Sequence, residues 1–108
     1  ITERFLKATL KGLEFAMDHR DSALDIVMTY AEKENRDHQR FMLDAELEDS
    51  VSDLTQQNGL GWMKDSQWQA LYDQLEEFQA LPAPFDYRTA YTDQFLQAVY
   101  SEGRLVWP

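Results

Sequence analysis

The chain has 108 residues and a mass of 12.7 kDa, and its 44% hydrophobic and 13% aromatic content suffices for one modest core in one domain. Its formal charge of −10 and pI near 4.4 oppose binding to nucleic acid or to anionic lipid surfaces. The absence of cysteine excludes disulfides, thiolate catalysis and Cys-based zinc sites, and no apolar run approaches the roughly 20 residues of a membrane span.

The first predicted helix, at residues 2–18, is the element around which we expect the rest of the chain to pack. Apolar residues recur there at steps of four, three and four, which places them on one helical face. They are Leu6, Leu10, Leu13 and Met17. An adjacent face carries a second line of residues: Phe5, Ala8, Gly12 and Ala16. After Phe5, every residue in this line has a small side chain or none. Both faces are expected to be covered, and the second allows another backbone to approach closely.

Two further helices are predicted before the glycine-rich middle of the chain. The polar cluster DHRD at 18–21 interrupts the first pattern, so a second helix is expected at 22–31. No Gly or Pro enforces that break, and one continuous helix remains an alternative. Leucine and valine at steps of four, four and three predict a third helix at 37–57, which Gly59 ends.

The last third of the chain is predicted to contain two helices joined by a proline-rich connection. The fourth helix, at 65–79, has an expected buried face made of Trp68, Leu71, Tyr72, Leu75 and Phe78. Pro82 and Pro84 then require an extended connection. A fifth helix follows at 92–102, closed by Gly103. No segment alternates with the period of a strand, so the predicted class is all-α with about five helices.

The residues that could bind a metal or act in catalysis form no convincing constellation. His38 and Glu34 are four positions apart, with Glu46 and Glu48 downstream, but they lie among charges of both signs on a face that resembles a solvated surface. His19 is interpreted as an exposed residue at a helix C-terminus. No serine nucleophile motif or phosphate-binding glycine loop is present. We therefore expect no catalytic residue, no metal and no cofactor.

Six aromatic residues are grouped in sequence around the fourth helix and its exit. They are Trp62, Trp68, Tyr72, Phe78, Phe85 and Tyr87. Such a group is able to line a pocket for a flat heterocycle by stacking. The helical spacing of Trp68, Tyr72 and Leu75 favours the alternative that the rings pack against the rest of the protein.

Three groups of residues carry a family resemblance: Phe5, Leu6, Ala8, Gly12, Phe15 and Ala16 in the first helix, Gly61, Met63 and Trp68 in the middle, and Tyr91, Thr92, Phe95 and Leu96 near the end. Their order resembles that in the C-terminal third of periplasmic solute-binding proteins of the thiamine-pyrimidine-precursor type, the hydroxymethylpyrimidine synthase-like family. The resemblance covers nearly the whole chain. Leu13 stands where the family often has Trp, and Arg20 where it often has Pro.

The resemblance implies a parent protein with the two-lobed α/β fold of type 2 binding proteins, of which residues 1–108 form one C-terminal helical segment. The numbering starts at Ile1 rather than at a methionine, so an excised or processed chain is expected. The family's ligand contacts lie mostly in the lobes, so no ligand-binding residue is assigned here. The implied role is non-enzymatic and periplasmic or extracytoplasmic. The small-molecule ligand binds through the missing lobes, and a transporter permease or a downstream signalling domain is the implied protein partner.

Other functions remain open at this stage. A free-standing acidic helical module that binds a partner protein is the main alternative, and a helical carboxylate metalloenzyme is a third. We also expect the isolated chain to form a homodimer, because helices shaped to cover a lobe leave an apolar face exposed once the lobe is absent.

Overall fold

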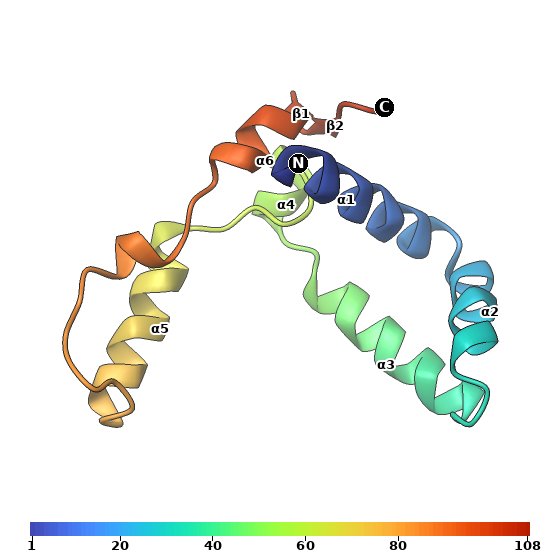
Figure 1. Cartoon of the computed structure of the whole chain (residues 1–108), viewed down its shortest axis with the longest axis horizontal. Helices are drawn as coiled ribbons and strands as arrows, with labels where there is room; N and C mark the ends of the chain where they lie inside the picture. Colours follow the sequence, from blue (N-terminus) through green and yellow to red (C-terminus); the bar gives the residue numbers. More distant parts are fainter.

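A computed structural model describes all 108 residues, Ile1–Pro108, and shows six α-helices, one 3-10 turn and one very short hairpin (Figure 1). The elements are α1 (Thr2–Asp18), α2 (Arg20–Tyr30), α3 (Arg36–Asp49), α4 (Asp53–Asn58), α5 (Asp65–Glu77), η1 (Tyr87–Ala90), α6 (Gln94–Val99), β1 (Tyr100–Ser101) and β2 (Arg104–Leu105). The all-α class predicted from the sequence is confirmed. None of the helices combines the length and the hydropathy that crossing a bilayer demands.

The apolar face predicted for α1 forms the centre of the molecule. Leu10 is buried, with Leu96 and Val99 of α6 as its partners in the core. Leu6 is half-buried and packs against this cluster. The first helix of the chain is thus held by the last one, and β2 also contacts α1.

The second line of α1 lies open, contrary to the expectation that both faces are covered within the chain. The Phe5 side chain is 75% exposed, and Ala8 is exposed as well. A Cβ atom placed on Gly12 would meet nothing within 4 Å. Only Ala16, near the end of the helix, is half-buried.

The break after α1 is confirmed at His19. Its backbone, with φ −135° and ψ 57°, leaves the helical region between α1 and α2. The His19 carbonyl accepts a 2.9 Å hydrogen bond from the Ala23 amide, so His19 serves as the N-cap of α2. The second helix therefore begins at Arg20, two residues earlier than predicted, and a continuous helix is excluded.

The single helix predicted at 37–57 is wrong, because the chain turns between α3 and α4. The Ser50 hydroxyl donates a 2.7 Å hydrogen bond to the Glu46 carbonyl at the end of α3. Two residues later, the Ser52 amide donates to the Thr55 hydroxyl at 2.8 Å and the Ser52 hydroxyl accepts from the Thr55 amide at 3.3 Å. This reciprocal cap starts α4 afresh. Local serine and threonine chemistry outweighs the leucine periodicity that suggested one helix.

The helix predicted at 92–102 is also wrong at its end, because α6 stops at Val99 and a hairpin follows. Glu102 and Gly103 both have positive φ, 50° and 74°, which is the geometry of a tight hairpin turn. Tyr100 pairs with Leu105 and Ser101 with Arg104 in an antiparallel ladder. Gly103 therefore makes a turn rather than closing a helix, and the two pairs are the only strand structure in the chain.

Helix α5 is less buried than predicted. Leu71, Leu75 and Phe78 are 48%, 37% and 76% exposed, so most of the expected buried face is in solvent. The neighbour of α5 is η1, which contacts the side of the helix that carries Tyr72. The connection predicted at Pro82 and Pro84 is free of helix, but the chain bends at Pro82 and Ala83 rather than running extended throughout.

The elements form two arms that meet at the small core, as Figure 1 shows with α2 and α3 on one side and α5 on the other. The radius of gyration is 16.9 Å, against about 13 Å for a compact chain of this length. The accessible surface is 8279 Å², about 2,000 Å² more than a compact monomer of this mass exposes. The chain therefore exposes an unusually large surface for its size, and large apolar side chains such as Phe5, Phe41 and Phe78 are part of it.

Candidate functional site

The most organised cluster of polar and aromatic groups lies between α5 and η1. The Asp65 carboxylate, in the first turn of α5, accepts hydrogen bonds of 2.8 Å from the hydroxyls of Tyr87 and Tyr91. The Arg88 guanidinium lies 3.4 Å from the same carboxylate. Next to them, the rings of Trp68 and Tyr91 are stacked, with centroids 4.9 Å apart and planes 1° from parallel. We call these five residues the Asp65 cluster.

The electrostatics of the Asp65 cluster keep its carboxylate ionised. The hydrogen bonds from Tyr87 and then Tyr91, with a smaller contribution from Arg88, lower the pKa of Asp65 below its usual range. The same hydrogen bonds raise the pKa values of Tyr87 and Tyr91, because they favour the neutral phenols. A carboxylate of this kind is a poor general acid, and all its strong partners come from the chain itself. The cluster therefore fastens η1 onto α5.

A shallow apolar pocket of about 210 Å³ lies beside the cluster and is lined by Met63, Gln67, Trp68 and Leu71. The Gln67 side-chain oxygen is already used, because it accepts a 2.9 Å hydrogen bond from the Lys64 amide. Sites for small molecules combine apolar walls with several convergent polar groups, which this pocket lacks.

A longer apolar groove of about 310 Å³ runs between α1 and α6. Its walls are Thr2, Phe5, Leu6, Leu10, Gly61, Met63, Thr92, Phe95 and Leu96. Leu10 and Leu96, two of the three core residues, are among them. Its polar groups are limited to two threonines and the backbone, so the groove suits an apolar surface better than a polar ligand.

A polar hollow of about 280 Å³ lies where α1, the α3–α4 turn and the start of α5 approach one another. Its lining includes Leu13, Asp49, Ser52, Trp62 and Gln67. The Trp62 indole nitrogen is buried and has no hydrogen-bond partner in the protein. A buried N–H of this kind is normally satisfied by an ordered water or another small acceptor.

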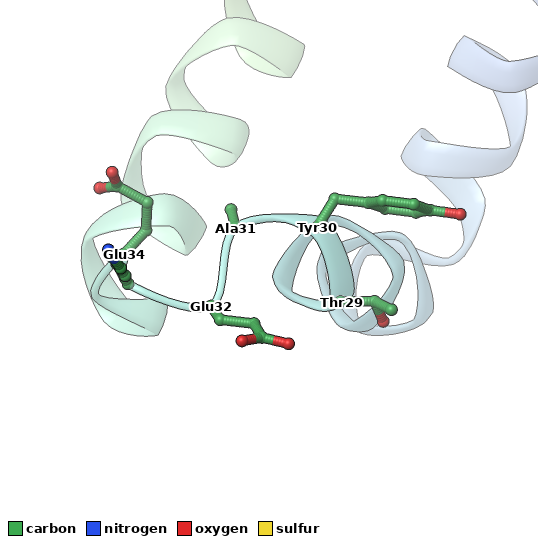
Figure 2. A pocket seen from close by; sticks show the side chains of 6 residues that line it. Thr29, Tyr30, Ala31, Glu32 and Glu34 are labelled. Carbon is green, nitrogen blue, oxygen red and sulfur yellow. The ribbon is translucent and has the colours of Figure 1, made fainter.

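The largest hollow, about 630 Å³, surrounds the turn between α2 and α3 at residues 29–34. Figure 2 shows Tyr30, Glu32 and Glu34 pointing in different directions from this turn, with no common centre. A surface whose side chains diverge offers a ligand no convergent contacts. The hollow is therefore open space beside a turn.

The remaining charged cluster joins α2 to α3. Asp44 accepts a 2.8 Å hydrogen bond from Arg20 and one of 2.9 Å from Arg40, and Arg40 also contacts Asp21. Nearby, Arg36 pairs with Asp25 at 2.6 Å. The bond from Arg20, followed by that from Arg40, lowers the pKa of Asp44. The pairs Arg20–Asp44, Arg40–Asp21 and Arg36–Asp25 join α2 to α3, whereas Arg40–Asp44 lies within α3.

The residues weighed as metal ligands are not brought together. His38 is exposed in the first turn of α3, where its backbone amide donates to the Asn35 side chain. No group of three or more His, Asp or Glu side chains has the geometry to hold a metal ion. His19 lies 5.0 Å from the Phe15 ring in an edge-on contact.

Two features of the Asp65 cluster were not found by sequence reasoning. Neither Asp65 nor Arg88 was among the candidate residues. The partners of Asp65 are 22 and 26 positions away, beyond any helical spacing, so no local pattern reveals them. The aromatic group packs in part, as favoured: Tyr72 meets Phe85 edge-on at 5.3 Å, and Trp62 packs against the core cluster, whereas Phe78 is 76% exposed.

No protein-family model and no solved structure matches the chain. Among curated proteins, the chain is similar to the riboflavin-binding protein RibY of Chloroflexus aurantiacus, with 27% identity over 99 residues. The match covers 89% of this chain and 28% of that protein, so the chain spans little more than a quarter of its relative's length. The chain thus resembles part of a small-molecule-binding protein.

Proposed function

We propose that this chain is the helical part of an extracytoplasmic protein that binds a small molecule without converting it. The observation that carries the proposal is the similarity to a riboflavin-binding protein along 89% of the chain. The resemblance of the motif order to solute-binding proteins points to the same class. The structure contributes an open helical framework with few buried residues, suited to packing against a larger body.

The proposed ligand is riboflavin or another flat heterocycle of similar size. Riboflavin is named by the relative, whereas the family resemblance points to a pyrimidine precursor of thiamine, which the comparison with RibY does not support. The ligand contacts are proposed to lie outside these 108 residues, because the hollows described above lack convergent polar groups. The role of this chain is then to support the binding body.

The test uses the complete product of the gene that encodes this chain. Riboflavin fluorescence is followed as the protein is added, with hydroxymethylpyrimidine and thiamine as competitors. Saturable quenching of riboflavin fluorescence supports the proposal. If hydroxymethylpyrimidine alone displaces the bound riboflavin, the pyrimidine is the better candidate for the natural ligand. A protein that binds none of these compounds, in calorimetry as well, contradicts it.

The extracytoplasmic location and the partner need separate experiments. Cell fractionation with an antibody against this chain tests the location, and protein found only in the cytoplasm contradicts it. A transporter permease or an attached signalling domain is the proposed partner. Loss of ligand uptake on gene deletion supports a permease, whereas unchanged uptake with a lost response to the ligand supports signalling.

A second candidate is an acidic helical module that binds a partner protein. The exposed side chain of Phe5 and the open apolar groove beside it favour this function. The riboflavin titration separates the two, because a protein-binding module leaves flavin fluorescence unchanged.

A further inference from the structure

The chain contains a single asparagine–glycine pair, Asn58–Gly59, which lies where α4 ends. In such a pair the backbone nitrogen of the second residue attacks the side-chain carbonyl carbon of the asparagine, and glycine hinders this attack least because it has no side chain. The bond to the side-chain nitrogen breaks, ammonia leaves, and a cyclic imide forms. Water then opens the imide to aspartate or to isoaspartate, whose main chain runs through the former side-chain carbon.

In the folded chain, hydrogen bonds hold both nitrogens that take part in this reaction. The attacking nitrogen, the Gly59 amide, donates to the Thr55 carbonyl at 2.8 Å. The departing nitrogen, in the Asn58 side chain, donates to the Leu54 carbonyl at 3.0 Å. Asn58 is also the last helical residue of α4, and closure of the imide ring requires its backbone to leave the helical conformation. Deamidation therefore has to wait until the end of α4 opens.

The C-terminal hairpin, which lies beside α4 where the two arms meet (Figure 1), covers this reactive pair. Gly59 is buried, and a Cβ atom there would lie 2.3 Å from the Tyr100 ring, so this ring lies directly on the Gly59 backbone. A Cβ atom on Gly103 would lie 2.3 Å from the Gln57 carbonyl, so the hairpin turn lies against the last turn of α4. The Tyr100 hydroxyl fixes the hairpin there by donating a 3.0 Å hydrogen bond to the Leu60 carbonyl. The end of α4 is free to open only after the hairpin has moved away.

We propose that Asn58 is a deamidation site that the hairpin β1–β2 keeps closed, and that deamidation stops the hairpin from closing again. Both products carry a carboxylate in place of the amide that donates to the Leu54 carbonyl, so two acceptors would face each other. In isoaspartate the lengthened main chain also shifts Gly59 against the Tyr100 ring, where no free space exists. The reaction is irreversible, so the site records how long the hairpin has been open.

The protection is measured by comparing the 108-residue chain with a peptide of residues 53–64, which is too short to hold a helix in water. Both are incubated at mildly alkaline pH, and mass spectrometry of peptide digests follows the conversion of Asn58 to aspartate and isoaspartate. The folded chain should react at least about tenfold more slowly than the peptide. Asn35 is exposed but precedes Arg36, so it should react slowly in both states and serves as the internal reference. Equal rates of Asn58 conversion in chain and peptide overturn the proposal.

The role of the hairpin is tested with substitutions of its tyrosine. Tyr100→Ala should raise the rate of Asn58 deamidation toward that of the peptide. Tyr100→Phe keeps the ring and loses only the hydrogen bond to Leu60, so its rate should lie between those of the two. Tyr72→Ala is the matched control, because it removes an aromatic ring from α5, on the other arm, and should leave the rate unchanged.

Circular dichroism checks that each variant keeps its helices, and Tyr100→Phe decides the matter where Tyr100→Ala has lost them. An unchanged rate in the tyrosine variants that stay folded overturns the proposal. So does an equal acceleration by Tyr72→Ala, because the protection would then come from the overall stability of the chain.

The failure of the hairpin to close again is measured on the deamidated chain, which ion exchange separates from the native chain by its additional negative charge. The NMR resonances of the Tyr100 ring should move toward their unfolded positions, whereas the Trp68 indole resonance, on the other arm, should not move. Asn58→Asp should cause a smaller shift, because it introduces the carboxylate without lengthening the main chain. Native Tyr100 resonances in the deamidated chain overturn the proposal. None of these measurements involves riboflavin, so their outcome is independent of the test of the proposed function.

Discussion

The rings of Trp68 and Tyr91 lie flat against each other, with planes 1° from parallel and centroids 4.9 Å apart. This contact joins α5 to the segment that leads into α6, and the Tyr91 hydroxyl adds a 2.8 Å hydrogen bond to Asp65. Because α5 has η1 as its neighbour and little else, the Asp65 cluster determines how firmly this arm is ordered.

Asp65→Asn should loosen η1 from α5. The substitution removes the negative charge that strengthens the hydrogen bonds from Tyr87 and Tyr91. We expect the Trp68 indole resonance in NMR spectra to move toward its unfolded position, with little change in the core. Asp73→Asn is the control on the same helix, and an equal effect of both variants would contradict the role of Asp65.

The cluster should open at both extremes of pH. The pKa of Asp65 is lower in the folded chain than the ordinary carboxyl pKa of about 3.9. The ionised carboxylate therefore stabilises the cluster fully above that ordinary pKa, and this stabilisation is lost as the pH falls through the lower pKa of the folded state. The raised pKa values of Tyr87 and Tyr91 mean that their contribution is present below about 10 and is lost as the pH rises through the higher folded values. The Trp68 resonance should therefore be constant between these limits. Tyr91→Phe should raise the pKa of Asp65, and an unchanged acid midpoint would refute the assignment.

Two glycine substitutions should act in opposite directions. Gly59 has φ 115°, and a Cβ atom there would lie 2.3 Å from the Tyr100 ring, so Gly59→Ala should cost about 1–3 kcal/mol or more of the free energy of unfolding. Gly12 lies in the middle of α1, and a Cβ atom placed there would meet no other atom within 4 Å. Gly12→Ala should therefore increase the free energy of unfolding by about 0.5–1 kcal/mol. Urea unfolding measures both, and a tolerated Gly59→Ala would show that the Tyr100 contact is not made.

Leu96→Ala should remove a large part of the stability of the fold. Leu96 is 6% exposed and belongs to a core of three buried residues, so a loss of about 2–5 kcal/mol is expected. Leu71 is 48% exposed, and Leu71→Ala should cost less than about 1 kcal/mol. Thermal unfolding of the two variants makes the comparison. Equal effects would mean that the core lies elsewhere.

The isolated 108-residue chain should not bind riboflavin or hydroxymethylpyrimidine with micromolar affinity. The pocket beside Trp68 is shallow and apolar, and the groove beside Phe5 lacks convergent polar groups. Calorimetry with each compound is the measurement. Micromolar binding that Trp68→Ala abolishes would show instead that the aromatic group forms a ligand pocket.

The sequence patterns correctly predicted those features of the fold that are set by residues close together in the chain. The buried face of α1, the break near His19 and the helix-free connection at Pro82 follow from patterns a few residues long. The turn at Ser52 was missed because a leucine repeat runs through it, although its capping box is itself a local signal. The hairpin after Val99 was missed because Gly103 is equally suited to end a helix or to make a tight turn.

The contacts of α5 could not be predicted from its own sequence. Leu71, Leu75 and Phe78 have the spacing of a buried face, but burial requires a neighbour, and the spacing does not show whether one exists. The Asp65 cluster depends on residues more than twenty positions apart, which only the folded chain brings together.

The pairing of Leu10 with Leu96 has a consequence for synthesis on the ribosome. The first helix of this chain finds its core partner only after α6 has been made, more than eighty residues later. Because synthesis proceeds at about 5–20 residues per second, the leucines of α1 remain without their core partner for several seconds. During that interval the nascent helix is a target for chaperones, and its second, uncharged side remains open even after the core has closed.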